Sequence, residues 1–207
     1  MKQPSLSRGS YVGGLISSTR QRCLGFCAIV WILVAGTEGL TPSLRAQQTP
    51  PEYPEYQVKA SYLLNFTRYI DWPTRSFKST NSPMVIGVLG QDRFGDDLRT
   101  LVQGKRVEGH DLVVRRIETL EQCRDTQILF ISSSEKRRIP DIVQSLKGAP
   151  VLTVGETDGF IQSGGIINFR LRNKDLFVDI NRPAADKVGL RISARLLQVI
   201  EKGKVAK

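Results

Sequence analysis

The chain has 207 residues and carries 30 Lys and Arg against 20 Asp and Glu, a formal net charge of +10. With 40% hydrophobic and 24% charged residues, its composition is ordinary for a globular protein and excludes a collagen-like or an intrinsically disordered chain. This length predicts one domain of roughly 100–200 residues with an extension. We therefore expect a single packed core.

The N-terminal segment, residues 1–46, is typical of an export signal. An uncharged apolar run, residues 23–36, is shorter than the roughly 20 residues that cross a bilayer as a helix and fits the core of a signal peptide. The basic residues that precede this run are Lys2, Arg8, Arg20 and Arg22. We expect cleavage after Ala46 and a periplasmic mature protein. A cut near Gly36 and a retained N-terminal anchor helix are the alternatives.

Export changes the meaning of the charge and of the cysteines. Residues 1–46 carry five Lys and Arg and one Glu, so a mature chain keeps +6 of the +10. The remaining basic residues lie in separate runs without the aromatic ladder of single-strand binders, which favours a solvated surface and no nucleic-acid partner. Cys23 and Cys27 leave with the signal, so Cys123 is alone and no internal disulfide is possible.

The rest of the chain alternates between helical and strand patterns. We expect a Pro-rich linker over 47–56, one domain over 57–202 and a short tail over 203–207. Strands separated by helices indicate a parallel sheet with crossover connections. The patterns predict helices over 56–72, 92–104 and 135–148, and strands over 84–90, 110–117, 126–133 and 150–156.

The C-terminal part departs from that alternation. Two alternating runs around "RNKD" predict a β-hairpin over 165–181, and the pattern over 184–203 predicts a closing amphipathic helix. The expected fold class is therefore α/β: three layers, a mostly parallel, Rossmann-like sheet, an antiparallel C-terminal hairpin and a closing helix.

No catalytic set can be assembled from the sequence. His110 is the only histidine and is expected at the surface, so neither a zinc site nor a Cys/His pair has its usual ligands. The glycines after the first strand do not follow the dinucleotide spacing. Glu156 and Asp158 lie in a Gly-rich turn with no evident partner base and are interpreted as turn formers. We expect no enzyme activity, no catalytic residue, no metal and no cofactor.

Three segments, in order, resemble one family. They are "VKASYLLNFTRYIDWP" (58–73), "PVLTVGETDGFIQSGGIINF" (150–169) and "DINRPAADKVGLRISARLLQVI" (179–200). Together they are similar to the YfiR-like family of periplasmic regulatory proteins, and the resemblance covers about residues 57–200.

That resemblance implies a compact α/β domain that regulates without catalysis. Its best understood members bind the periplasmic part of a membrane diguanylate cyclase and repress it, which lowers cyclic-di-GMP signalling and biofilm formation. The implied partner is such a cyclase or another inner-membrane signalling protein, and a homodimer is a further expectation. The chain departs from members with intramolecular disulfides, because Cys123 has no partner.

The Gly-rich stretch 153–169 is interpreted as a strand–turn–strand scaffold. Gly159 and the pair Gly164-Gly165 relieve backbone crowding, Phe160 lies under the sheet, and Asp158 or Ser163 caps a turn. The candidate binding residues are Asn65, Trp72, Asp158, Phe160, Gly164 and Asn168. A small-ligand sensor or solute-binding module remains the alternative function, and its pocket would lie at the strand ends near Gly90, Ser132 and Glu156.

Overall fold

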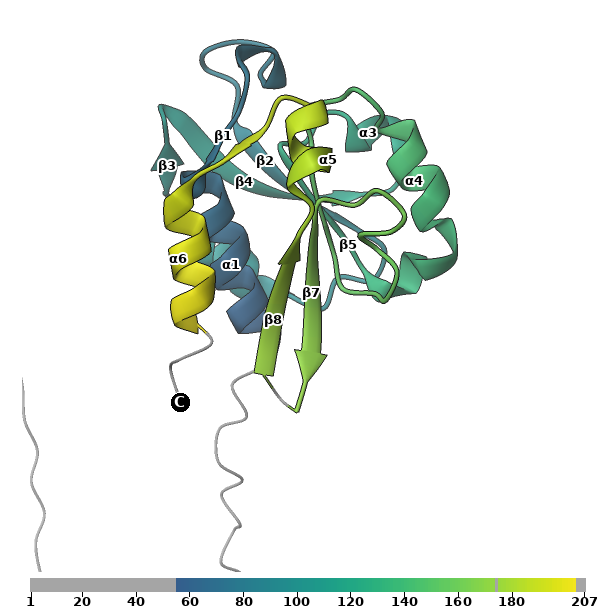
Figure 1. Cartoon of the computed structure of the whole chain (residues 1–207). Helices are drawn as coiled ribbons and strands as arrows, with labels where there is room; N and C mark the ends of the chain where they lie inside the picture. The colour runs from purple at the N-terminus through teal and green to yellow at the C-terminus, as the bar shows by residue number, and fades with distance from the viewer. Residues whose placement is uncertain (1–54, 174, 204–207) are drawn as a thin grey trace, which may run out of the picture. The chain divides into compact units, whose positions relative to one another are not determined.

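The structure, a computed structural model, describes residues 55–173 and 175–203. These residues form a seven-stranded sheet of order β3-β4-β2-β5-β6-β7-β8 with helices packed on it (Figure 1). A separate two-stranded sheet pairs β1 with β9. The strands are β1 (Ile70–Asp71), β2 (Met84–Leu89), β3 (Arg106–Val107), β4 (His110–Ile117), β5 (Ile128–Ile131), β6 (Leu152–Gly155), β7 (Ile167–Arg172), β8 (Asp175–Ile180) and β9 (Arg191–Ile192).

The centre of the sheet is parallel and buried on both faces. Strand β2 pairs in parallel with β4 and β5, β5 pairs with β6, and β6 pairs with β7. Along β5, Ile128 and Phe130 face one apolar cluster, whereas Leu129 and Ile131 face the other. The continuous apolar runs of the sequence thus supply two cores, because successive side chains point to opposite faces of a strand.

Helices cover both faces of the sheet. The helical elements are α1 (Glu55–Tyr69), η1 (Thr74–Ser76), α2 (Asp96–Val102), α3 (Leu120–Cys123), η2 (Ser133–Arg138), α4 (Ile139–Ser145), α5 (Arg182–Lys187) and α6 (Ala194–Gly203). Helix α1 contacts α2 and α6, and α3 and α4 lie on the opposite side of the sheet (Figure 1). Phe66 of α1 stacks on Phe169 of β7 with ring centroids 6.1 Å apart, which fixes the helix across the strand.

Both edges of the sheet are antiparallel, and the hairpin pattern predicts the one formed by β7 and β8 but not the one formed by β3 and β4. Strands β7 and β8 pair over six positions, from Ile167↔Ile180 to Arg172↔Asp175, and their hairpin extends below the helices in Figure 1. The expected α/β class with a mostly parallel sheet and an antiparallel C-terminal hairpin is confirmed. The two-residue strands β1, β3 and β9 and the short α3 are not predicted by the periodicity.

The prediction of one closing helix over 184–203 is wrong. The segment forms α5, then β9, then α6. Gly189 adopts φ +83°, a left-handed conformation that ends α5, and Leu190 becomes fully buried. Ile192 then pairs with Ile70, and the Ser193 hydroxyl accepts from the Leu196 N–H at 3.3 Å to begin α6.

His110 is buried, contrary to the surface position expected for it. The residue is 9% exposed, and its ring stacks on that of Phe77 with 3.8 Å between centroids. Its Nδ1 lies 2.6 Å from the Ser82 carbonyl. The stacking partner lies far from His110 in sequence, so no local pattern reports it.

The expected signal peptide and linker, residues 1–54, lie outside the described residues. Within residues 55–173 and 175–203, no helix is long and apolar enough to span a membrane. Cys123 is a free, buried thiol in this part of the chain.

Candidate functional site

The crevice where doubly wound sheets bind ligands is closed here. In the sheet, β4 follows β2 on one side and β6 follows β5 on the opposite side, so the direction of the strand order reverses between β2 and β5. The carboxyl ends of β2 and β5 therefore form the topological switch point. The Ser134 hydroxyl fills this crevice and accepts from the Gln91 N–H at 2.9 Å. A Cβ at Gly90 would overlap Ser134, so the glycine permits this close contact.

A buried polar cluster lies beside that crevice, at the end of β6. Oε2 of Glu156 accepts from the Lys59 ammonium at 2.6 Å and from the Tyr56 hydroxyl at 2.9 Å. Oε1 of Glu156 accepts from the Ser133 N–H at 2.9 Å. Lys59 also pairs with Glu55, one helical turn earlier in α1. The side chains of Lys59 and Glu156 are 3% and 5% exposed, so water is almost excluded from this pair.

Aromatic residues surround the pair. The Lys59 ammonium lies 4.4 Å from the Tyr56 ring centroid, and the Tyr56 ring packs edge-on against Phe94. Nη1 of Arg93 donates to the Tyr56 hydroxyl at 3.4 Å. Four segments distant in sequence therefore meet at one point: α1, the β2–α2 loop, η2 and the end of β6.

The electrostatics favour the charged form of both partners. Burial by itself raises the pKa of the Glu156 carboxyl, but the bonds from Lys59 and Ser133 outweigh burial and hold the pKa below its usual value. Burial by itself lowers the pKa of Lys59, and the bonds to Glu156 and Glu55 outweigh it and raise that pKa. Because the Glu156 oxygens are already engaged, the pair joins elements together and offers no poised base.

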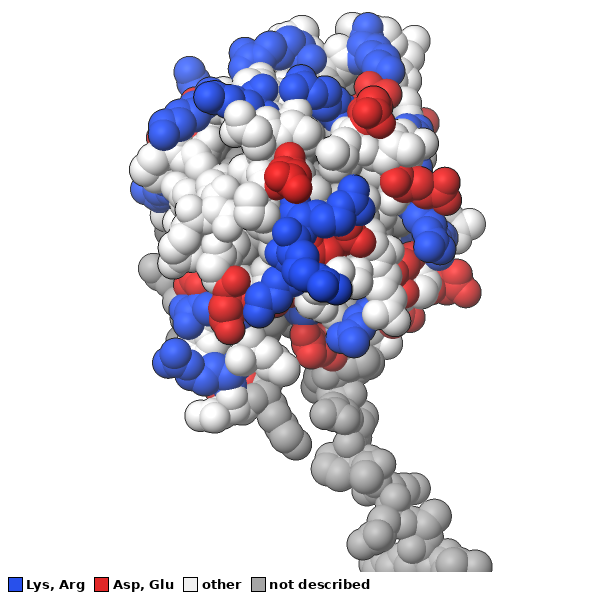
Figure 2. All heavy atoms as spheres, turned by 90° about the vertical axis from the view of Figure 1, so that its right-hand side faces the viewer, with Lys and Arg blue, Asp and Glu red and all other residues white. Residues whose placement is uncertain are grey.

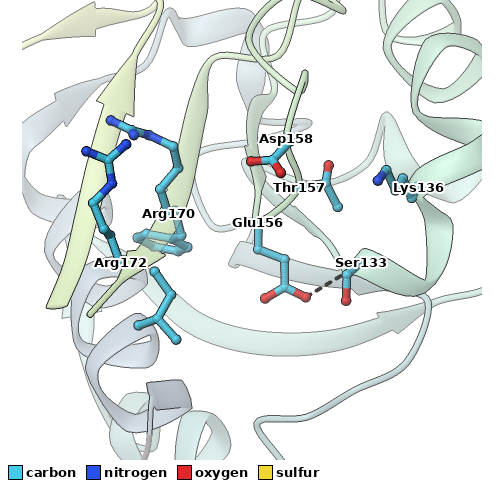
Figure 3. A pocket seen from close by; sticks show the side chains of 9 residues that line it. Ser133, Lys136, Glu156, Thr157, Asp158, Arg170 and Arg172 are labelled. Atoms are coloured by element: carbon cyan, nitrogen blue, oxygen red, sulfur yellow. Dashed lines mark hydrogen bonds between the residues drawn. The ribbon is translucent and has the colours of Figure 1, made fainter. Parts of the chain in front are cut away.

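A pocket of about 420 Å³ opens next to the cluster, between η2 and the far half of β7 (Figure 3). Figure 3 shows Arg170 and Arg172 on one side of it and Lys136 on the other. The lining residues are Ser133, Lys136, Glu156, Thr157, Asp158, Phe169, Arg170, Leu171 and Arg172. Thr157 is 6% exposed, and its hydroxyl has no hydrogen-bond partner among the described residues.

The charges around the pocket are partly neutralised. Arg170 pairs with Asp179, through Nη2 at 2.8 Å and through Nε. Within the described residues, Lys136 and Arg172 have no ion-pair partner. Lys136 belongs to the exposed basic run of η2. On the face of the molecule that Figure 2 shows, basic side chains are interspersed with acidic ones. Among the described residues, no group of three or more His, Cys, Asp and Glu can hold a metal ion.

The candidate binding residues do not form one site. Asp158 is exposed and lines the pocket, and the buried Asn168 lies on β7, one residue before the lining Phe169. Trp72 is half-buried and donates from Nε1 to the Gln127 carbonyl at 3.4 Å, and Asn65 is half-buried on α1.

The remaining two candidates, Phe160 and Gly164, lie in the turn that follows β6. Phe160 is fully buried in the core under α4, as expected, and a Cβ at Gly165 would overlap its ring. Gly164 adopts φ +93° and lies against Val143. Ser163 caps the turn by donating to the Gly159 carbonyl at 3.0 Å.

Sequence reasoning missed the ion pair, although both residues carry a local signal. Lys59 lies on the same helical face as the apolar residues Tyr62, Leu63 and Phe66, where a charge needs a partner. Glu156 follows directly on a buried strand, at the edge where parallel strands end. Of the three residues near which a pocket is expected, Glu156 lines the pocket, whereas Gly90 and Ser132 are not among its lining residues.

Fold and site together define an α/β domain in which the buried charges of Lys59 and Glu156 neutralise each other. A family model described as YfiR/HmsC-like matches residues 56–200, which is most of the chain, so the chain belongs to this family. The family is periplasmic and generally regulatory. No curated protein matches the chain.

Two solved structures show a partial likeness. One is an ABC domain in complex with L-Trp from Streptococcus pneumonia, with 12% identity, a TM-score of 0.37, and 56% of this chain and 53% of that chain covered. The other is a conserved domain protein from Vibrio cholerae, with 12% identity, a TM-score of 0.37, and 55% and 52% covered. The chain spans about half the length of these structures, and at such TM-scores the likeness bears on neither fold nor function.

Proposed function

We propose that the protein is a non-enzymatic periplasmic regulator that binds the periplasmic part of a membrane diguanylate cyclase and represses it. The observation that carries this proposal is the family match over residues 56–200, which spans nearly all the described residues. Export by a signal peptide cleaved after Ala46 belongs to the same proposal, since the target faces the periplasm.

Repression by binding requires a difference in affinity between two states of the target. To hold a cyclase 99% off from an even balance, the regulator must favour the off state by roughly 2.7 kcal/mol. A standard protein interface of about 1,600 Å² supplies this easily. The exposed side chain of Leu171 offers an apolar contact for such an interface, and the side chains of Arg170 and Arg172 point to the opposite face of β7.

Deletion of the gene tests the proposal. Cellular cyclic-di-GMP and surface attachment are expected to rise, and a copy secreted to the periplasm is expected to restore both. A copy without residues 1–46 is the matched control, because it stays in the cytoplasm and should restore neither. Unchanged cyclic-di-GMP in the deletion strain, with the cyclase expressed, would contradict repression.

A small-ligand sensor is the second candidate, and the pocket favours it. A volume of about 420 Å³ lies within the range of small-molecule sites, and the pocket is lined by Thr157, whose hydroxyl has no hydrogen-bond partner among the described residues. Thr157→Val removes the hydroxyl at nearly constant volume. If the domain responds to a ligand here, this variant loses the ligand-induced rise in melting temperature while its own melting temperature stays close to that of the wild type.

A further inference from the structure

The far half of β7 has a strand partner on one side only. Strand β6 pairs with β7 at two positions, Val154↔Ile167 and Gly155↔Asn168, and then ends. Strand β8 pairs with β7 along its whole length. From Phe169 to Arg172, no described strand lies on the inner side of β7, and the pocket occupies this place.

The backbone groups of Leu171 point into that gap. The Asn181 N–H donates to the Ile166 carbonyl at 2.8 Å, so this carbonyl points toward β8, whereas the Ile166 N–H donates to the Thr153 hydroxyl of β6. In an antiparallel ladder the backbone N–H and C=O groups of successive residues point alternately toward and away from the partner strand. Those of Asn168, Arg170 and Arg172 therefore point toward β8, and those of Leu171 point away from it. The peptide groups of Leu171 therefore form a short internal sheet edge.

The pocket follows this edge and does not lie on one face of the strand. Four consecutive residues, 169–172, line it, although their side chains alternate between the two faces of the sheet. At about 3.3 Å per residue, this edge accommodates an extended segment of about four residues. Ser133 and Lys136 of η2 form the opposite wall.

The walls indicate which segment fits. Leu171 is 54% exposed, an unusual position for a large apolar side chain. Lys136 and Arg172 lie on opposite walls and have no ion-pair partner among the described residues. Two other lining charges form ion pairs, Arg170 with Asp179 and Glu156 with Lys59. Asp158 also lines the pocket and offsets part of this charge, so two cations against one carboxylate leave a net basic pocket. An acidic side chain on the incoming segment would meet these cations.

We propose that the inner edge of β7 is a docking slot for an extended, acidic segment of the partner protein, which adds a short strand between η2 and β7. Main-chain bonds to Leu171 give affinity, and Lys136 and Arg172 select a carboxylate. This inference rests on the proposed function for the partner's identity, the periplasmic part of the membrane cyclase.

Calorimetric titration of the purified protein with the purified periplasmic part of the cyclase tests the slot. Leu171→Pro and Leu171→Thr both lose the leucine side chain, but Pro alone also removes the N–H that points into the gap, and the bonds to β8 remain in both. Leu171→Pro is expected to bind about tenfold more weakly than Leu171→Thr, the effect of roughly one hydrogen bond. Arg172→Glu is expected to weaken binding by about tenfold or more, whereas Arg116→Glu, an exposed arginine of β4, should change it by less than about twofold.

Melting temperatures close to that of the wild type establish that the variants are folded. If the wild type binds the cyclase and Leu171→Pro and Arg172→Glu bind it with the same affinity, the docking slot is wrong and the proposed function still holds. No binding by the wild type, together with unchanged cyclic-di-GMP in the deletion strain, would overturn both. If Leu171→Pro instead abolishes a dimer and leaves cyclase binding intact, the occupant is a second copy of the chain and the inference is wrong.

Discussion

The ammonium of Lys59 lies 2.6 Å from the carboxylate of Glu156, and this nearly fully buried pair joins the first helix to the end of β6. The two residues are 97 positions apart in sequence. Their contact fixes the position of α1 beside the pocket, so the stability of the domain and the shape of the candidate site depend on the same pair.

Removal of one partner of this pair is expected to be strongly destabilising. Lys59→Met leaves a buried carboxylate without its cation, which typically costs about 3–5 kcal/mol. The double variant Lys59→Met/Glu156→Gln is expected to lose less, because the amide oxygen still accepts from Ser133 and no charge stays buried. Urea unfolding at neutral pH measures both. The exposed pair Arg106–Asp111 is the control, and Asp111→Asn should change stability by less than about 1 kcal/mol.

Acid is expected to weaken the protein through Glu156. The pKa of this carboxyl is lower in the folded protein than its ordinary value of 4.5, so its stabilisation is present above 4.5 and is lost as the pH falls through the folded pKa. Glu156→Gln cannot titrate. Unfolding midpoints between about pH 7 and about pH 3 should therefore fall more steeply for the wild type than for Glu156→Gln. Parallel curves would show that other carboxyl groups cause the acid sensitivity.

Phe66 and Trp72 are expected to differ in their contribution to stability. Phe66 is fully buried against Tyr62 and Phe169, and Phe66→Ala should cost about 3–5 kcal/mol by leaving a cavity. Trp72 is half-buried, so Trp72→Ala should cost less. Thermal unfolding checks the order. A variant with a wild-type melting temperature and lost repression would assign that aromatic residue to an interface.

Gly165 is expected to tolerate no side chain while Phe160 is present. A Cβ at this position would overlap the Phe160 ring, and such overpacking typically costs about 1–3 kcal/mol. A double-mutant cycle of Gly165→Ala with Phe160→Leu should show a coupling of about 0.5 kcal/mol or more, because the smaller side chain makes room. Additive effects would mean that the backbone, and not the ring, excludes the methyl group.

Cys123 is expected to be unreactive in the folded protein. Burial raises the pKa of its thiol to about 11, so almost no thiolate is present near neutral pH. A maleimide added at about pH 7.5 should label the protein at the rate at which it unfolds, and labelling should speed up in urea. Rapid labelling of the native protein, followed by mass spectrometry, would show that α3 opens locally.

The sequence by itself determined the elements whose signal is local. The apolar runs at 84–90, 126–133 and 150–156 predict β2, β5 and β6 because a strand buried on both faces has no polar alternation. The alternation around "RNKD" predicts the hairpin, and the position of Phe160 follows from the glycines on either side of it. The three ordered motifs also identify the family, since they occur in the right order along nearly the whole domain.

Only the tertiary structure decided which distant residues meet. Periodicity shows that Lys59 lies on an apolar helical face, but burial of its ammonium depends on a carboxylate that arrives from β6, 97 residues later. The closing segment breaks at Gly189 because Ile192 pairs with Ile70 in β1, a contact that no pattern within 184–203 contains. The gap beside Leu171 exists because β6 ends two pairs into its ladder with β7, and the length of a ladder depends on both strands together.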